Sequence, residues 1–480
     1  MTITLLRRFA QNSASRIASV LIALTAFVGC NADRLNIPNF NESPVDQVAD
    51  RALLQNAVSG ILGEQRAGMA GLVSNVGIFG RESYNYTSSE PRNITLFLAT
   101  FPLDNSGFTN GQWDARFRNM RNTINVIRQV APATFINDAE KNAVRGFANT
   151  MRALDLFYVI ATRDSLGVPT ALDSLAPVPQ PFVSRDSVYR FISATLDQAA
   201  TQLAGAGTVA FPFRLTTGFA GFDTPATFIQ FNRALAARVL VYRGSLGCGA
   251  PCYTQALTAL SASFINSTPT GDLRRGVYHV YSAASGDLLN GISRQTAPDQ
   301  LSHPSIRPDA QRQVGGVLLD NRFVTKVRTI PTRNAPGGIA VGIPTDVDFN
   351  LYVDQTTSIP IIRNEELILL RAESNVGLGQ FAAALTDIND IRARAGNLPP
   401  ILSFASPTEA VDAILYERRY SLLWEGHRWF DVRRYNRINT LPLDIPTHFR
   451  VRVMPVPQAE CLARQLVIGA QPDLRAPGCP

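Results

Sequence analysis

The segment from Tyr416 to Tyr435 is unusually dense in aromatic and arginine side chains, reading YERRYSLLWEGHRWFDVRRY. Its spacing predicts two consecutive helices. Glu417 and Glu425 could come within reach of one another, as two catalytic carboxylates would. Arginine is the preferred partner of a buried carboxylate, and the segment supplies Arg418, Arg419 and Arg428. We therefore interpret the segment as architectural, with its charges paired.

Helical periodicity covers much of the remaining chain. Apolar residues recur at every third or fourth position in segments 113–130, 137–162, 184–203, 227–242, 363–378 and 381–395. The sequence Ser406-Pro-Thr-Glu409 has a capping serine followed by proline and an acid, which is typical of a helix start. The chain is therefore predicted to be mostly α-helical.

Two helix starts share a further pattern. Tyr253 precedes Ala256 by three residues, and Phe381 precedes Ala384 in the same way, with apolar residues continuing at helical spacing. In tetratricopeptide repeats an aromatic side chain wedges between helices while a small alanine lets them approach closely. An ordinary antiparallel helix pair would also favour alanine at the crossing. The pattern predicts a body of tetratricopeptide-type helix pairs, interrupted by long insertions.

The insertions are predicted at about residues 63–110 and 265–360. A helix from Ser43 to about Leu62 precedes the first, and both are rich in Gly, Ser, Asn, Pro and aromatic residues. Loops on a rigid scaffold are where binding residues concentrate, and sugar rings lie well on aromatic faces. The candidate ligand-binding residues are Tyr84, Tyr86, Tyr278 and Tyr281. The alternative is that these rings only pin the loops to the helices.

The N-terminus predicts secretion and a lipid anchor. Arg7, Arg8 and Arg16 precede an apolar run that ends at Phe27-Val-Gly-Cys30, and the run is too short to span a bilayer. A small residue followed by cysteine at this point is typical of a lipobox, in which Cys30 is acylated. The expected organisation is a signal peptide over 1–29, a tether over 30–42 and one domain over 43–480. An ordinary signal peptide with a nearby cysteine is the alternative.

Four cysteines remain after Cys30, which suits an oxidising compartment. Cys248 and Cys252 bound a tight loop, and Cys461 and Cys479 flank the C-terminal tail. Two local disulfides are the simplest pairing, although four cysteines allow three connectivities and free thiols are the alternative. The formal net charge is +7, and no basic tract is present, so we expect no nucleic-acid partner.

Motifs for catalysis or metal binding are weak. Glu365 and Glu366 are adjacent and so cannot flank one bond as a glycosidase pair does. The four histidines lack metal-ligand spacing, and His427 is expected to be a buried, hydrogen-bonded residue. Asp346-Val-Asp-Phe-Asn350 begins like a calcium loop but lacks its later glycine and glutamate. We therefore predict no catalytic residue, no metal and no cofactor.

The order of these motifs resembles the RagB/SusD family of outer-membrane nutrient-uptake lipoproteins. The resemblance rests on the lipobox at Cys30 and on a series of later segments: 113–130, 143–157, 167–169, 232–242, 343–346, 363–373, 388–396, 417–431 and 454–458. Thr162-Arg-Asp-Ser-Leu departs from the family's usual phenylalanine–glycine–aspartate exit. The tail after Pro457 lacks the usual asparagine–proline–glycine ending.

The resemblance implies a binding protein and not an enzyme. Its members cap a TonB-dependent β-barrel transporter at the cell surface and hand it oligosaccharides or, in some members, peptides. It implies four tetratricopeptide-like helix pairs with insertions forming the ligand face, and it transfers no ligand residues. The expected function is nutrient capture at the outer membrane, most simply of an oligosaccharide. The alternative is a lipid-anchored scaffold that binds only proteins or peptides, and a glycan hydrolase is a third class.

Overall fold

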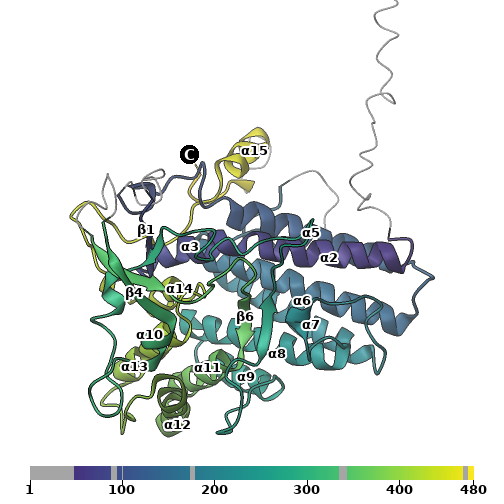
Figure 1. Cartoon of the computed structure of the whole chain (residues 1–480). Helices are drawn as coiled ribbons and strands as arrows, with labels where there is room; N and C mark the ends of the chain where they lie inside the picture. The colour runs from purple at the N-terminus through teal and green to yellow at the C-terminus, as the bar shows by residue number, and fades with distance from the viewer. Residues whose placement is uncertain are drawn as a thin grey trace, which may run out of the picture. The chain divides into compact units, whose positions relative to one another are not determined.

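Antiparallel helices form the larger part of the fold, and strands and loops gather beside them (Figure 1). The computed structural model describes residues 48–87, 95–99, 101–172, 179–334, 343–468 and 474–479. Among these residues no helix combines the length and apolar character needed to cross a bilayer. The predicted signal peptide, Cys30 and the tether lie outside the described residues.

The helices confirm the mostly α-helical fold class. Those of the first half are α2 (Arg51–Ala67), α3 (Met69–Phe79), α5 (Gly111–Val130), α6 (Asp138–Arg163), α7 (Arg185–Gly205), α8 (Pro225–Arg243) and α9 (Ala250–Ser261). Those of the second half are α10 (Asn321–Lys326), α11 (Asn364–Gly377), α12 (Phe381–Ile391), α13 (Pro407–Ser421), α14 (Arg428–Arg434) and α15 (Gln458–Ile468). Short 3₁₀ or π-helical turns are η2 (Thr95–Ala99), η3 (Asp164–Leu166), η4 (Thr217–Phe219), η5 (Gly244–Cys248), η6 (Pro304–Ile306), η8 (Arg392–Gly396) and η9 (Ile438–Thr440).

Three antiparallel strand pairs lie in the loop-rich part. Strand β1 (Ser83–Asn85) pairs with β3 (Gln300–Ser302). Strand β2 (Gly276–His279) pairs with β6 (Ile359–Arg363), and β4 (Val327–Arg333) pairs with β5 (Thr345–Phe349). The segment that begins like a calcium loop therefore lies mostly in β5, where Asp346 contacts Arg307 and Asp348 contacts Arg328.

The start of the chain's body differs from the prediction. The first helix begins at Arg51, and the Asp50 side chain caps it by accepting the Leu53 amide, whereas residues 48 and 49 are not helical. The predicted start at Ser43 is therefore wrong. Helix α3 also occupies part of the predicted loop 63–110. Most of its residues are buried, so it has no polar face and no helical period in its sequence.

Tyr253 occupies the wedge position that the repeat pattern predicts. It is 5% exposed and its ring fills the space against Gly244 and Gly377. A methyl group added at either glycine would overlap the ring. Ala256 and Ala384 are both fully buried. The absence of side chains at these glycines thus lets α8, α9 and α11 approach one another around one aromatic ring. The Cys248–Cys252 disulfide closes the turn that leads into α9.

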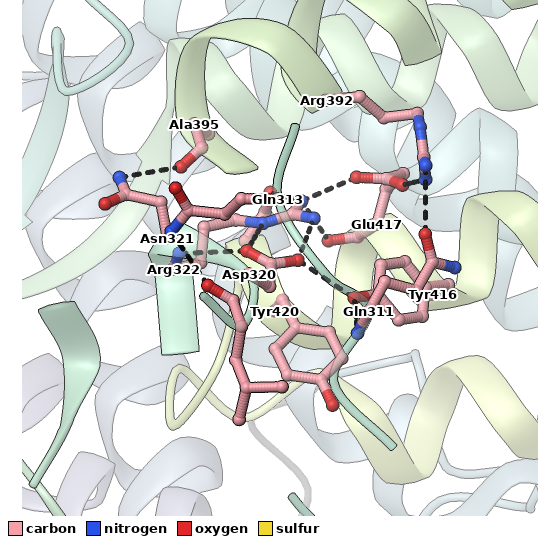
Figure 2. Close-up of polar contacts among 12 residues, drawn as sticks. Gln311, Gln313, Asp320, Asn321, Arg322, Arg392, Ala395, Tyr416, Glu417 and Tyr420 are labelled. Carbon is pink, nitrogen blue, oxygen red and sulfur yellow. Dashed lines mark hydrogen bonds and ion pairs between the residues drawn. The ribbon is translucent and has the colours of Figure 1, made fainter. Parts of the chain in front are cut away.

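The aromatic segment does form two helices, α13 and α14, and its charges are paired inside the protein. Glu417 lies between two guanidinium groups, at 2.6 Å from Arg322 and 2.7 Å from Arg392. Asp320 accepts two further bonds from Arg322, at 3.0 and 2.6 Å. Burial lowers the pKa of Arg322, but the nearby carboxylates of Glu417 and Asp320 raise it above its ordinary value. Figure 2 shows this network joining α13 to α10 and to the segment after α12.

The ion-pair partners of Glu417 and Glu425 differ from those that the sequence analysis predicted. Glu417 pairs with Arg322 and Arg392, and Glu425 pairs with Arg363 at 2.8 Å. The prediction that Arg418, Arg419 and Arg428 would serve them is wrong, because these side chains point to other neighbours. The carboxylate that Arg418 contacts, at 2.8 Å, is Asp431.

Asp431 and His427 show opposite effects of burial. Burial raises the pKa of Asp431, but Arg418 and Arg434 outweigh it and lower the pKa to about 2. Burial lowers the pKa of His427 to about 4, so the ring is neutral at pH 7. His427 is buried as predicted, although its Nδ1 has no hydrogen-bond partner among the described residues.

The substitution Glu417→Gln should destabilise the protein by about 3–5 kcal/mol, because it removes the carboxylate shared by two buried guanidinium groups. Asp412→Asn is a matched control on the same helix. Asp412 is half-exposed and pairs with Arg437 at 2.9 Å, so its loss should cost less than about 1 kcal/mol. Urea unfolding measures both values, and similar values for the two variants would contradict a structural role for the Glu417 pairs.

Candidate functional site

A cleft lies where α5, the segment after α6 and the C-terminal helix α15 meet. Its volume is about 230 Å³, and its lining residues are Trp113, Phe117, Arg121, Pro169, Ala171, Leu172, Pro179, Gln180, Glu460 and Arg464. Residues spaced by four share one face of a helix. Trp113, Phe117 and Arg121 therefore present two rings and one guanidinium group from α5 to the same cleft.

The aromatic part of the cleft is held by neighbouring rings and by a buried arginine. The Trp113 ring lies 4.5 Å from Phe117 and 5.9 Å from Phe182, measured between centroids, and is nearly parallel to Phe182. The Arg163 guanidinium group lies 5.5 Å from the Trp113 ring and donates to the Thr109 carbonyl at 3.1 Å. Burial lowers the pKa of Arg163 to about 9. Trp113 is therefore fixed in position, with only 5% of its surface exposed.

The segment after α6 reaches the cleft because the chain reverses sharply at Gly167. Its φ angle of 68° lies in the region that favours glycine, and a methyl group there would overlap the Val183 carbonyl. Val168 pairs with Val183 as an isolated antiparallel bridge. This bridge brings Pro169 and Gln180 to the same edge of the molecule.

Arg464 joins the third side of the cleft to the other two. Its guanidinium group donates to Glu460 at 2.8 Å, to the Leu474 carbonyl at 2.6 Å and to the Gln180 carbonyl at 2.9 Å. It also lies 4.6 Å from the centroid of the Phe182 ring. The Cys461–Cys479 disulfide closes the tail over the same helix. Together these contacts fix α15 as one wall.

The chemistry of this lining suits binding better than bond cleavage. Flat apolar rings lie beside a carboxylate, a guanidinium group and an amide, which are groups that can contact the faces and hydroxyls of a sugar. Glu460 is the one carboxylate in the lining as described, whereas a glycosidase of the usual kind needs two. Of the described residues, no group of three or more His, Cys, Asp or Glu side chains is arranged to hold a metal ion.

None of the four tyrosines that were predicted to bind a ligand lines this cleft. Tyr84 and Tyr86 are 0% and 1% exposed and Tyr281 is 7% exposed. Their role in binding a ligand therefore stays a prediction that the cleft does not support. The Tyr84 hydroxyl donates to Asp444, and the Tyr86 hydroxyl donates to the Ile343 carbonyl at 3.0 Å. Tyr278 is half-buried and its hydroxyl donates to the Arg274 carbonyl. The Tyr84 bond thus joins the first insertion to Asp444, and the Tyr86 bond joins the two insertions to one another.

Trp113 and Phe117 were missed as site residues because they lie in a regular helical pattern, which predicts core positions. Arg121 is the signal that distinguishes them. It lies on the same face of α5 as Trp113 and Phe117, and a charged residue on an otherwise apolar helix face indicates that this face reaches solvent. Phe101, outside the cleft, is 82% exposed, and its ring lies 5.5 Å from Phe449.

The SusD family model matches residues 347–460, which run from β5 to the first residues of α15. This segment of the chain is thus similar to the SusD family. A SusD-like protein, P38, from Formosa agariphila is 36% identical over 88 residues, which make up 17% of this chain and 18% of that protein. The matched part of that relative is thus less than a fifth of its length.

Solved structures of SusD-like proteins share the fold over most of the chain. A SusD superfamily protein from Bacteroides vulgatus is 15% identical, with a TM-score of 0.64 over 87% of this chain and 98% of that one. Surface glycan-binding protein A from Bacteroides thetaiotaomicron, solved with laminarihexaose, is 14% identical, with a TM-score of 0.61 over 88% of this chain and 98% of that one. At these identities the likeness concerns the fold alone.

The substitution Arg464→Met should loosen α15 while the helical body stays folded, because it removes three hydrogen bonds of a buried charged group. Hydrogen–deuterium exchange should rise about tenfold or more in α15 and stay unchanged in α6, since such bonds contribute about 1.5–3 kcal/mol each. Leu462→Ala, on the exposed side of the same helix, is the control. Equal exchange in the wild type and Arg464→Met would show that other contacts hold the wall.

Proposed function

We propose that this SusD-like chain is a lipid-anchored receptor at the cell surface, which binds an oligosaccharide and passes it to a TonB-dependent outer-membrane transporter. The observation that carries the proposal is the cleft in which the half-buried ring of Phe117, packed against the buried Trp113, lies beside Arg121, Gln180 and Glu460. Rings of this kind cover the apolar face of a sugar, and the polar groups around them fix its hydroxyls.

The fold relatives support a carbohydrate ligand. One similar structure is that of a laminarin-binding SusD-like protein, and another holds laminarihexaose. The lipobox at Cys30 supports anchoring through lipid, which needs more than one acyl chain to be stable. A binding role without catalysis agrees with a cleft that has Glu460 as its one described carboxylate. Delivery to a transporter rests on the family resemblance.

The substitution Phe117→Ala should weaken oligosaccharide binding at least about tenfold, taking as a guide the about 1–3 kcal/mol by which an aromatic ring binds a stacked nucleic-acid base. Trp113→Ala should weaken binding as well, because the buried Trp113 ring supports Phe117. Isothermal titration with laminarihexaose, maltohexaose and cellohexaose provides the measurement. Glu460→Gln should weaken binding less, and Leu462→Ala should leave it unchanged. Thermal melting of each variant confirms that it is folded.

Two results would contradict this assignment of the cleft. One is wild-type affinity in all of the Trp113, Phe117 and Glu460 variants. The other is loss of binding in Phe101→Ala with wild-type affinity in the cleft variants, because that would move the ligand to the exposed ring beside Phe449.

A pull-down from solubilised outer membranes tests the hand-off to a transporter. The bait is the full chain with Cys30 intact, and Cys30→Ser is the control that lacks the anchor. We expect a TonB-dependent β-barrel to co-purify in stoichiometric amount with the anchored protein. Recovery of the chain without any barrel would contradict delivery to a transporter and favour a scaffold that acts alone.

A further inference from the structure

Residues 441–449, which follow η9, form neither a helix nor a strand. We call them the latch segment. Arg81, which is buried just after α3, holds both ends of this segment by donating to the Pro442 and Phe449 carbonyls, each at 3.1 Å. The Phe449 amide donates to the Leu98 carbonyl at 2.7 Å. The position of the latch segment thus depends on contacts with other parts of the chain.

Asp444, in the middle of the latch segment, is shared by groups from both insertions. The Tyr84 hydroxyl, from β1 in the first insertion, donates to Asp444 Oδ2. The ring of His303, which directly follows β3 in the second insertion, contacts the same oxygen through Nε2 at 3.2 Å. The Nε atom of Arg81 lies 3.9 Å from that oxygen. One carboxylate therefore joins the latch segment to both insertions.

The hydrogen bonds of His303 fit a neutral ring. Its Nδ1 accepts the Ser305 amide at 3.2 Å, so this network assigns the ring proton to Nε2, which faces Asp444. A second proton would have to enter at Nδ1, where it would meet the hydrogen of the Ser305 amide. The ring is 1% exposed, and burial lowers its pKa. Protonation of His303 is therefore opposed both by burial and by this hydrogen bond.

His448, within the latch segment, is a second buried imidazole beside the same carboxylate. It is 4% exposed, and neither of its ring nitrogens has a hydrogen-bond partner among the described residues. Its Nδ1 lies 3.9 Å from Asp444 Oδ2, which is too far for a hydrogen bond. Burial and the nearby Arg81 lower its pKa to about 4, although Asp444 acts in the opposite direction. The Tyr84 ring lies between the two imidazoles, with centroid distances of 4.8 Å to His303 and 6.2 Å to His448.

The charged and titratable groups that face the two imidazoles are Asp444, Tyr84, Tyr86, Arg81, Arg419 and Arg450. Arg419 is already paired with Asp309 at 2.7 Å. Burial raises the pKa of both tyrosines, so they are neutral at pH 7. Burial also acts to raise the pKa of Asp444, but its bonds to His303 and Tyr84 outweigh it and lower the pKa to about 2. Asp444 therefore keeps its charge over the range in which histidine titrates.

We propose that the latch segment is acid-sensitive: it joins the two insertions at neutral pH and is released when His303 and His448 take up protons. At neutral pH the charges of Arg81 and Asp444 oppose one another. Two further protons would add two positive charges that no second carboxylate compensates among the groups facing the rings, and such charges are costly in a buried site. Release would separate Phe449 from the exposed ring of Phe101, whose centroid lies 5.5 Å away.

The direction of the pH effect follows from the two histidines. A histidine whose pKa is lower in the closed state than its ordinary value of about 6.5 stabilises that state fully above the ordinary value. This stabilisation is lost as the pH falls from about 6.5 toward the pKa in the closed state, which is about 4 for His448. The latch segment should therefore be closed at pH 7 and progressively released in acid. This inference does not rest on the proposed function.

Hydrogen–deuterium exchange of the full chain between about pH 7 and about pH 4 tests the inference, with rates corrected for the intrinsic effect of pH on amide exchange. The amides to follow are those of His448 and Phe449, which donate to the Ile445 and Leu98 carbonyls. We expect their protection to fall about tenfold or more by about pH 5, because the released segment binds protons that the closed segment excludes. Amides of α6 should stay more strongly protected than these two at every pH.

Two substitutions and a matched control locate the effect. His448→Phe keeps a flat ring without a titratable nitrogen, and His303→Gln keeps an amide that can donate to Asp444. Each should reduce the acid response of the latch segment, and the double variant should reduce it to about twofold or less. His279→Gln removes a buried histidine that faces Arg66 and Arg116 instead of the groups around Asp444. It should leave the acid response of the latch segment as in the wild type.

Three results would overturn the inference, and the first two need only the wild-type protein. Equal protection of the latch segment and α6 in acid would show that the segment opens only when the whole protein unfolds. Protection that falls only below about pH 4 would assign the response to carboxylates, which titrate there. An undiminished acid response in a folded double variant would show that other groups than His303 and His448 carry it. Oligosaccharide binding at neutral pH is measured separately, so failure of the proposed function would leave this inference standing.

Discussion

The burial of arginine is the constraint on which this fold depends. The largest fully buried side chains include Arg81, Arg116, Arg163, Arg238, Arg418 and Arg464. A guanidinium group keeps its charge at any physiological pH, and removing it from water is costly unless acceptors surround it. Each buried arginine therefore requires a carboxylate, a carbonyl or an aromatic face at a defined position, and the elements that supply these groups are fixed relative to one another.

The pairs join elements that are distant in sequence. Arg238 of α8 donates to both oxygens of Glu366 in α11, at 2.7 and 2.6 Å, and Arg116 of α5 contacts Asp155 of α6 at 3.1 Å. The segment that the family model matches, residues 347–460, holds Glu366, Glu373, Glu417 and Asp431. The matched segment thus holds four of the carboxylates that pair with arginines inside the helical body.

The candidate site is built on the same helical body. The cleft uses one face of α5, whose other faces are held by α2 and α6. Three remote segments complete the cleft, and Arg464 ties them together through two carbonyls and Glu460. The candidate site is therefore assembled from segments that contact the buried arginines Arg163 and Arg464.

Sequence periodicity was sufficient to predict the helices that have one polar face. The predicted segments 113–130 and 137–162 correspond closely to α5 and α6, because alternation of apolar and polar residues at helical spacing is a local property. Sequence periodicity did not predict α3. Most residues of this helix are buried, so its sequence shows no alternation of polar and apolar residues. The wedge at Tyr253 was also predictable from its spacing to Ala256.

What the sequence by itself determined is therefore the fold class, the helix pairs and the architectural nature of the segment from Tyr416 to Tyr435. Only the tertiary structure decided which arginine meets which carboxylate, because Arg322 and Arg392 reach Glu417 from elements far from it in the chain. It also decided which aromatic rings line the cleft and which are covered elsewhere in the body. Tyr84 looks like a loop residue in sequence, but the body covers it, whereas Trp113 looks like a core residue and lines a cleft. Exposure depends on what packs against a side chain, and that information is not local.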